Sequence, residues 1–561
     1  MVCREDGAPS ARRSIPSCGF AHETSRLEGN TSRLEGNTSR LEGNTSRYTG
    51  STSRPTDNTS RIDDDMNRSG DRIFPVRRPQ ESYRSPHEAV WWRGEGLRWL
   101  HWALRCPFGK VKWASGVRRS VTGDVRRAIG VFLLGGLALV APALDGRVGA
   151  PVSAVGIIAP FVLLAVAAFV TTDGPLFEFF ARGSDRRDGR LYGLASFALS
   201  VTALGVLVVA FDLPIAAFVA AVFLFTTGDL GQTLASRRWP DPVANASTFA
   251  AAGAVGALAA ISAAGALGVP VPSLPVATFV AASGAILGAL IRSALTVRDD
   301  SLVLLPAGLL VWFLLAIGVD PSVERVAVGL ALTVLLGYLA YALGTASVTG
   351  MLTGVLLALF AVVLGGYGWF ALLVTFFGLG GLSSKYRYDE KLERGIAESN
   401  EGARGGGNVL ANSAVALVAV VGYAASDHAG VDPAIFEFAF AGAVAAALAD
   451  TFSSEFGGLF DDPRLITTFE RVDPGTDGGV TWQGVVAGLV GAGIIAGLGG
   501  YFFVLGPLAT VAVLLAGTVG MTVDSLLGAT LEGERLDNQG VNLLATLSAG
   551  IFAAAVVLVW A

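Results

Sequence analysis

The chain has 561 residues, of which 52% are hydrophobic and 16% are charged, with 71 glycines and a formal net charge of -5. This composition excludes an ordinary soluble domain, which carries about 25% charged residues. We expect no nucleic-acid partner. Only His428 of the four histidines lies in the apolar region, and all three cysteines precede it. Metal or acid-base chemistry there must therefore use aspartate and glutamate.

Residues 1–120 differ in composition from the rest of the chain. Thr-Ser-Arg recurs every seven residues from Thr24 to Thr59 without an apolar face, which is typical of a low-complexity, disordered segment. The five tryptophans between Trp91 and Trp113, together with nearby arginines, could instead form a helix on a membrane surface. We favour a third interpretation, in which translation naturally starts near Val121 and residues 1–120 are translated upstream DNA.

From Ile129 onward, apolar stretches of roughly 20 residues follow one another, and this length crosses a bilayer core as a helix. We predict an all-α, polytopic integral membrane helix bundle with about fifteen transmembrane helices, in an N-terminal domain (121–320) and a C-terminal domain (321–561). The predicted spans are 128–144, 151–171, 191–211, 213–228, 248–267, 271–291, 302–319, 325–343, 349–366, 368–382, 409–426, 432–449, 480–498, 503–520 and 541–560.

Arginine and lysine gather in alternate connections between these spans. Four arginines precede the first span, and further groups follow the second, fourth and sixth spans and occupy the connections 383–408 and 450–479. Because such residues collect on the cytoplasmic side, we predict that the N-terminus and these connections face the cytoplasm of a cell membrane.

The first long connection of the C-terminal half is rich in glycine and polar residues, which makes it a functional candidate. The stretch Gly402–Gly407 could present backbone amides to an anion, with Arg404 and Lys385 adding positive charge. A merely flexible loop is the alternative. Asn408 and Asn412, one turn apart at the start of a span, either cap and cross-link helices or bind a ligand.

The second long connection begins with carboxylates. Asp450 ends an apolar span and Glu455 follows five residues later, at a position where ionisable groups are costly unless something binds them. Paired carboxylates suit a divalent cation that bridges to phosphates, whose oxygens could also meet Arg464 and Arg471. The alternative is an ordinary hydrated helix end. Tight turns are marked by Gly475, Gly478 and Gly479.

A third connection repeats the pattern, because Asp524 follows an apolar span and Gly528 lies one turn later. In the N-terminal half, Asp229 also ends a span and precedes Arg237 and Arg238, which makes these three residues candidates for a second site. The recurrence of an aspartate at the end of an apolar span indicates that the same arrangement is used more than once. The sequence lacks the GxxxxGK[ST] phosphate loop, so a nucleotide must be held in another way.

Four blocks of the C-terminal half resemble one known family. They are LSSKYRYDEKLERGIAESNEGARGGGNVLAN, ADTFSSEFG, PRLITTFERVDPGTDGGVT and DSLLGATLEGERLDNQGVNLLATL. Together they resemble the transmembrane family that includes the plant phytyl-phosphate kinase and animal transmembrane protein 19, with the first block matching only loosely. In the N-terminal half, GRLYGLASF and TTGDLGQTLASRRW resemble the phytol and dolichol kinase family, which transfers phosphate, typically from CTP, to a polyprenol.

The resemblance implies a CTP-dependent phosphotransferase that converts a polyprenyl monophosphate to the diphosphate. The lipid tail would lie in the bilayer and its phosphate would reach the cytoplasmic connections. Asp450 and Asp524 would be catalytic and, with Glu455, would hold Mg²⁺. Substrates would be bound by Lys385, Arg404, Asn408, Asn412, Arg464, Thr467, Arg471, Gly475, Gly478, Gly479, Ser525, Gly528, Asn538 and Asn542.

Two other functions stay open. A transporter or flippase for a small or lipid-linked anion places ionisable residues within interrupted spans, whereas here they cluster at span ends. A silent membrane scaffold would tolerate alanine at both Asp450 and Asp524. The sequence does not indicate an oligomeric state.

Overall fold

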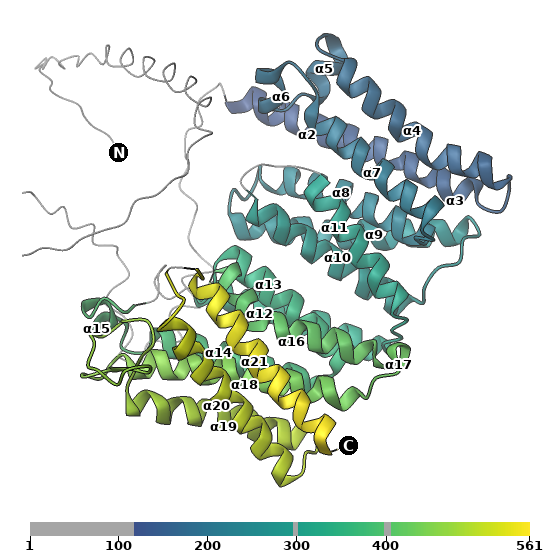
Figure 1. The fold of residues 1–561 in the computed structure, drawn as a ribbon. Helices are drawn as coiled ribbons and strands as arrows, with labels where there is room; N and C mark the ends of the chain where they lie inside the picture. Colours follow the sequence, from purple (N-terminus) through teal and green to yellow (C-terminus); the bar gives the residue numbers. More distant parts are fainter. Residues whose placement is uncertain (1–116, 296–300, 398–404, 534, 561) are drawn as a thin grey trace, which may run out of the picture. The chain divides into compact units, whose positions relative to one another are not determined.

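The structure, a computed structural model, describes residues 117–295, 301–397, 405–533 and 535–560, and these are almost entirely helical (Figure 1). Fourteen of the described helices are long and apolar enough to cross a membrane, and Leu302–Ala316 is a shorter apolar helix. Each of the fifteen predicted spans corresponds to one of these helices, which confirms the polytopic helical fold. Residues 1–116, and with them the repeats and the tryptophan-rich segment, lie outside the described residues.

The described helices are numbered in chain order. The first set comprises α2 (Val117–Gly135), η1 (Gly136–Leu139), α3 (Val140–Leu144), α4 (Ala150–Val170), α5 (Gly174–Phe180), α6 (Gly183–Asp188), α7 (Tyr192–Ala210), α8 (Ile215–Ala235), α9 (Pro242–Ala266), α10 (Leu274–Ala294) and α11 (Ser301–Ala316).

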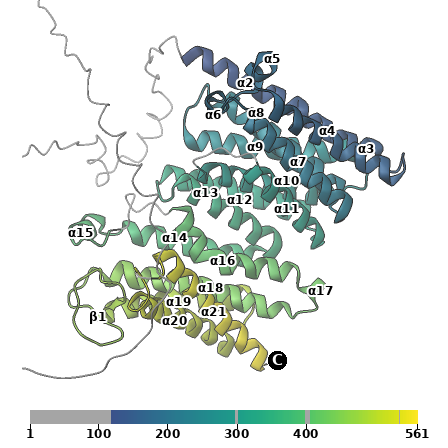
Figure 2. The same ribbon diagram turned by 45° about the horizontal axis from the view of Figure 1, so that its top comes forward.

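The second set continues to the C-terminus and includes one short hairpin. It comprises α12 (Val323–Ala342), α13 (Val348–Phe360), η2 (Ala361–Gly365), α14 (Tyr367–Lys385), α15 (Tyr388–Glu393), α16 (Gly406–Ala424), α17 (Ser426–Ala429), α18 (Pro433–Gly457), β1 (Arg464–Leu465), β2 (Gly479–Val480), α19 (Trp482–Phe502), α20 (Pro507–Gly528) and α21 (Asn538–Trp560). Strands β1 and β2 pair antiparallel, and Figure 2 shows β1 and α15 at the same end of the C-terminal helices.

Local sequence explains where several helices begin. Proline occupies the first or second position of α4, α9, α10, α18 and α20, where its missing N–H is not needed. The side chain of Thr481 accepts a hydrogen bond from the Gly484 N–H at 3.1 Å and caps α19. Between α13 and α14 the chain turns at Gly366, whose φ of 107° favours glycine.

Helix α18 is the centre of the C-terminal helices. It packs against α14, α16, α19, α20 and α21, and its residues 441–449 are buried throughout. Alanine and glycine dominate this stretch, because in a membrane helices associate through close backbone approach between small side chains. Helix α18 is therefore closely packed up to Ala449, the residue before Asp450.

The same packing pattern occurs in both halves. Helix α8 contacts α9, α10 and α11, while α9 contacts α10 and α10 contacts α11; α18 to α21 make the same set of pairings in the same order. The two four-helix groups are thus structural counterparts. Position by position, α8 corresponds to α18 and α10 to α20.

Three predicted spans end seven or eight residues before their helices do. The spans 213–228, 432–449 and 503–520 continue as helix to Ala235, Gly457 and Gly528. Hydropathy detects only the apolar stretch, whereas a helix continues for as long as its backbone hydrogen bonds are kept. Aspartates that we expected just beyond the spans therefore lie on the last turns of helices.

We expect Gly491→Ala to destabilise the C-terminal helices by about 1–3 kcal/mol, the usual cost of overpacking. A Cβ at Gly491 would lie 2.9 Å from the Leu448 carbonyl oxygen of α18, so the two backbones must separate. The matched control is Gly497→Ala in the same helix, where a Cβ meets nothing within 4 Å. Thermal unfolding in detergent measures both variants. Equal midpoints for the two would contradict the close packing of α18 and α19.

Candidate functional site

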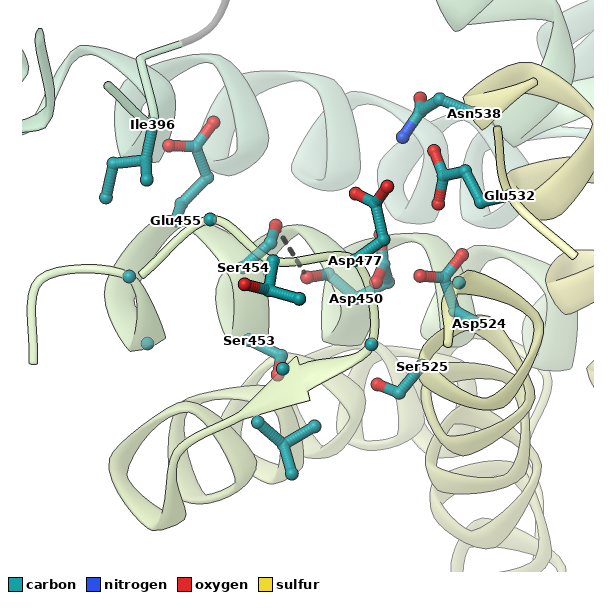
Figure 3. Close-up of a pocket in the computed structure, with 18 of the residues that line it drawn as sticks. Ile396, Asp450, Ser453, Ser454, Glu455, Asp477, Asp524, Ser525, Glu532 and Asn538 are labelled. Carbon is teal, nitrogen blue, oxygen red and sulfur yellow. Dashed lines mark hydrogen bonds between the residues drawn. The ribbon is translucent and has the colours of Figure 1, made fainter. Parts of the chain in front are cut away.

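A cavity of about 760 Å³ lies where α18 and α20 end and where α16, α19 and α21 begin. Its walls also include the connection between α18 and α19 and the segment 395–397 (Figure 3). The cavity therefore collects the polar ends of five helices. All three long connections singled out in the sequence contribute to it.

Six carboxylate residues line the cavity. They are Asp450, Glu455, Asp477, Asp524, Glu532 and Asp537. No lysine, arginine or histidine is present among the described lining residues. Such a lining repels a free anion and attracts cations.

Asp450 on α18 and Asp524 on α20 form the centre of this acidic lining. Helices α18 and α20 pack against each other, and both side chains line the cavity. The Oδ1 atom of Asp524 is buried and finds no hydrogen-bond donor among the described residues. A buried polar atom is usually paired, so this oxygen is suited to an incoming ligand.

Glu532 extends the acidic lining from the connection after α20. Burial raises the pKa of the Glu532 carboxyl above its ordinary value, and the nearby Asp477 carboxylate raises it further, with smaller contributions in the same direction from Asp450 and Asp537. A hydrogen bond with the Asn538 side chain opposes this effect. In Figure 3 Asp477, Glu532 and Asn538 lie on the same side of the cavity as Asp524.

Glu455 is in a different environment. Its Oε2 accepts a hydrogen bond from the Nζ of Lys391 at 2.6 Å, and Lys391 also donates to the Ser383 carbonyl oxygen at 2.7 Å. The Lys391 side chain is only 1% exposed. Glu455, which we predicted to bind metal, therefore lines the cavity with its charge already offset by a buried lysine.

Close glycine contacts shape the cavity wall. Gly478 has a φ of 74°, and a Cβ there would lie 2.5 Å from the Ala529 backbone nitrogen. A Cβ on Gly407 would lie 2.4 Å from the Gln539 side chain, so α16 and α21 begin next to each other. At Gly478 only glycine allows this approach, whereas at Gly407 the end of the Gln539 side chain would have to move.

Two helices begin at the cavity. Gly405, which has no side chain to cap α16, lines it together with Gly407 and Asn408, and the Gly406 N–H donates to the Thr349 Oγ1 at 3.3 Å. Asn538 and Gln539, at the start of α21, line it as well, but there the Asp537 side chain caps the helix by accepting a hydrogen bond from the Gly540 N–H at 2.9 Å. The remaining N–H groups at the start of α16 and the positive end of its dipole suit a phosphate group. Carboxylates and the start of α16 thus line one cavity.

The structure brings together most of the predicted site residues. Those that line the cavity are Asp450, Glu455, Asp524, Asn408, Gly475, Gly478, Gly479, Ser525, Gly528 and Asn538. Those that do not line it are Lys385, Asn412, Arg464, Thr467, Arg471 and Asn542. Arg404 lies outside the described residues.

The predicted cations point to other partners. Lys385 donates to the Leu343 carbonyl oxygen at 2.7 Å and Arg464 to the Phe469 carbonyl oxygen at 2.8 Å. Arg471 pairs with Asp462 at 3.1 Å. We correct the expectation that these residues surround the phosphates, because each instead ties down loop backbone or a loop carboxylate.

The two predicted asparagines outside the cavity make intrahelical contacts. The Nδ2 of Asn412 donates to the Asn408 carbonyl oxygen at 3.0 Å, and the Nδ2 of Asn542 donates to Oδ1 of Asn538 at 2.9 Å. Asn542 thereby contacts the side chain of the lining residue Asn538, whereas Asn412 contacts the backbone of the lining residue Asn408.

Sequence reasoning missed four residues of the site, namely Asp477, Glu532, Asp537 and Lys391. The first three lie in polar connections with many acidic neighbours, such as LEGERLDNQG, where nothing in the sequence separates lining from solvent-facing carboxylates. The glycines after Asp477 were the available signal, since tight turns bring backbone and short side chains close to a ligand.

The second-site candidates are not grouped as predicted. Asp229 is 1% exposed, and it pairs with Arg292 of α10 at 2.5 Å and with Arg127 of α2 at 3.2 Å. Arg237 and Arg238 are exposed instead. Helices α2 and α10 pack on α8, and this packing brings Arg127 and Arg292 against Asp229 although both are distant from it in the sequence.

Comparison with known proteins supports the reading of the C-terminal half. Residues 331–550 match the model of the family described as integral membrane protein DUF92. An uncharacterised membrane protein of Methanocaldococcus jannaschii is 36% identical over 197 residues, which cover 33% of this chain and 75% of that protein. All of the cavity's lining residues fall within the matched range.

Two proteins of Arabidopsis thaliana are similar to this chain. Protein VTE6, chloroplastic, is 27% identical over 186 residues, which cover 31% of this chain and 54% of that protein. Protein PGR is 32% identical over 192 residues, which cover 30% of this chain and 65% of that protein. This chain therefore spans less than two thirds of either plant relative. No solved structure matches the chain.

Proposed function

Because the chain belongs to the DUF92 family of integral membrane proteins, we propose that its cavity is a phosphotransferase site that converts a polyprenyl monophosphate, such as phytyl or geranylgeranyl monophosphate, to the diphosphate. The observation that carries the proposal is that Asp450, Asp524 and the start of α16 line one cavity at the ends of membrane spans. The resemblance to the family of the plant phytyl-phosphate kinase supports it.

The position of the cavity suits a substrate with a buried tail and a hydrated head. The helices around it are apolar along their lengths, whereas the lining at their ends is polar. A prenyl chain would stay among lipid tails while its phosphate reached the cavity. The start of α16, with Gly407 and Asn408, is the part of the lining best suited to the acceptor phosphate.

The residues present fit a bound Mg²⁺. Asp524 offers a buried oxygen without a donor, and Asp450 lies next to it, so these two would hold the ion. Mg²⁺ is usually bound by one or two carboxylates together with substrate phosphates. When bound, it would supply the positive charge that the described lining lacks.

We propose CTP as the donor, on the strength of the resemblance. An oxygen of the prenyl phosphate would attack the γ-phosphorus, the bond to the β-γ bridging oxygen would break, and CDP would leave with that oxygen. The lining residues would hold the two phosphate groups in line and keep their orientation during the transfer.

The test uses membranes that contain the full chain, incubated with geranylgeranyl or phytyl monophosphate, Mg²⁺ and each of CTP, ATP, GTP and UTP. We expect the prenyl diphosphate by mass spectrometry with CTP, and its loss when EDTA removes the metal. Membranes without the chain are the control. No diphosphate with any nucleotide or either lipid would refute the proposal, and uptake of the monophosphate into vesicles would then favour transport.

A further inference from the structure

The cavity has room for more than a phosphate group, and its two ends differ in chemistry. Its volume of about 760 Å³ lies within the range of about 300–1,000 Å³ that is typical of sites for ligands of drug size. Figure 3 shows Asp524, Glu532 and Asn538 at one end and Ile396 and Glu455 at the other. The first end accounts for the metal of the proposed function, which leaves the second end for another part of a ligand.

The second end has an apolar wall formed by Ile396 and Phe460, which come from segments far apart in the sequence. Arg394 and Asp461, close neighbours of these two residues in the chain, form an ion pair at 2.9 Å. Ile396 also packs against the backbone just before Phe460, since a Cβ on Gly458 would lie 2.7 Å from Ile396 Cδ1. The two apolar side chains therefore belong to the same end of the cavity.

Phe460 is the single aromatic residue among the described lining residues, and it is 42% exposed. Two aromatic residues shortly before it in the chain are paired, because Phe456 packs against Phe452 and Tyr386. No ring pair among the described residues includes Phe460. An aromatic ring that lines a cavity without a ring partner suits a flat ligand, and every nucleobase offers a face for stacking.

Glu455 supplies a hydrogen-bond acceptor at the same end. The Nζ of Lys391 donates to Oε2 of Glu455 and to the Ser383 carbonyl oxygen, which fixes the orientation of the carboxylate. A ligand in the cavity would meet the other oxygen, Oε1, which accepts hydrogen bonds and cannot donate them. The exocyclic amino group of cytosine is a suitable donor to a glutamate, whereas a carbonyl oxygen replaces that amino group in uracil.

We propose that this end of the cavity binds the base of the nucleoside triphosphate donor. Phe460 stacks on the ring of the base, and Glu455 accepts a hydrogen bond from its exocyclic amino group. The triphosphate extends past Ser454, which Figure 3 shows between Glu455 and Asp450, toward the acidic end. The inference rests on the proposed function, in which CTP is the donor, and it names the residues that select cytosine.

Nucleotide binding tests this inference without lipid or turnover. The full chain, purified in detergent with Mg²⁺, is dialysed to equilibrium against radiolabelled CTP, UTP or ATP. We expect CTP to bind about 10- to 100-fold more tightly than UTP, the ratio that corresponds to one hydrogen bond to a charged group. Binding of ATP as tight as that of CTP would overturn the selection of cytosine.

Two variants separate the contributions of stacking and hydrogen bonding. Phe460→Ala should weaken the binding of CTP and UTP alike, by about 5- to 100-fold, which is the usual effect of removing one base-stacking ring. The matched control is Phe469→Ala, at a 68% exposed aromatic in the same connection that does not line the cavity, and it should bind CTP as the unmodified chain does. Glu455→Gln should bind CTP and UTP about equally, because its amide can donate to the carbonyl oxygen of uracil.

Equal affinities of the unmodified chain for CTP and UTP, no binding of any nucleotide, or equal effects of Phe460→Ala and Phe469→Ala would overturn the inference. If Glu455→Gln fails to fold, as judged by its gel-filtration profile, Lys391→Met/Glu455→Gln takes its place, because it also removes the buried positive charge. Binding of CTP with the expected dependence on Phe460 and Glu455, but without formation of a prenyl diphosphate, would retain this inference and remove the proposed function. Phosphoryl transfer from CTP and UTP with equal efficiency would do the reverse.

Discussion

Asparagine at Asp450 or Asp524 is expected to lower the rate of prenyl diphosphate formation by on the order of 100- to 1,000-fold, the usual cost of losing one preorganised charge at a transferring group. Each change keeps the shape of the side chain and removes a negative charge that would hold the metal. The double variant should be about as slow as either single variant, because residues that act as a unit are not additive. Initial rates with saturating CTP measure all three.

The thermal stability of the same variants distinguishes a catalytic role of Asp450 and Asp524 from a structural one. The two carboxyl groups face each other in a part-buried lining, so removing one charge relieves repulsion and should leave the thermal midpoint unchanged or higher. The control variant Asp320→Asn, at an exposed carboxylate between α11 and α12, should change neither the rate of diphosphate formation nor the thermal midpoint. Activity within about threefold of the unmodified chain in both single variants, with normal insertion, would contradict a catalytic role and favour a scaffold, given the magnitude expected above.

The substitution Lys391→Met is expected to give the largest loss of stability, about 3–5 kcal/mol, because it leaves a buried charge without its partner. The Glu455 side chain is 9% exposed, and its carboxylate would lose the hydrogen bond from Lys391. Thermal unfolding of the full chain in detergent measures the effect. We expect most of the loss to be recovered in Lys391→Met/Glu455→Gln, which removes the stranded charge.

A surface ion pair is the matched control for this prediction. Arg186 pairs with Glu178 at 2.5 Å, but the two side chains are 47% and 65% exposed. Arg186→Met should therefore change stability by less than about 1 kcal/mol. If Lys391→Met is as mild as Arg186→Met, the Lys391–Glu455 pair does not hold the segment around α15 against α18.

The sequence predicts the fold better than the site, and the reason is physical. A membrane span can be recognised by its length and apolar composition, and all fifteen predicted spans have a matching helix. Charged residues at span ends, such as Asp450 and Asp524, also stand out, because burying them is costly. Their meeting in one cavity follows from the packing of α20 on α18, which periodicity does not reveal.

The basic residues show where sequence reasoning fails. Lys385, Arg464 and Arg471 lie in the right connections, yet their long side chains reach carbonyl oxygens or a loop carboxylate. Lys391 was passed over in the same segment and is the lysine that meets the cavity through Glu455. Which way a long side chain turns depends on nearby backbone acceptors, and that information is absent from residue order.

The N-terminal half illustrates the same limit. A span ending in Asp229 resembles the acidic span ends of the C-terminal half in sequence, but Arg127 and Arg292 surround it in space. The packing of α8 to α11 repeats that of α18 to α21, while the chemistry at its end does not. Metal-dependent transfer is therefore proposed only for the cavity of the C-terminal half.

The most direct test reconstitutes the purified full chain in liposomes with geranylgeranyl monophosphate, Mg²⁺ and CTP labelled with ³²P at its γ-phosphate. We expect label in the extracted prenyl diphosphate, and little or none when Asp524→Asn replaces the unmodified chain. Equal labelling by the variant would place the chemistry outside this cavity. No labelling by a correctly folded, unmodified chain would contradict phosphoryl transfer to a prenyl phosphate itself.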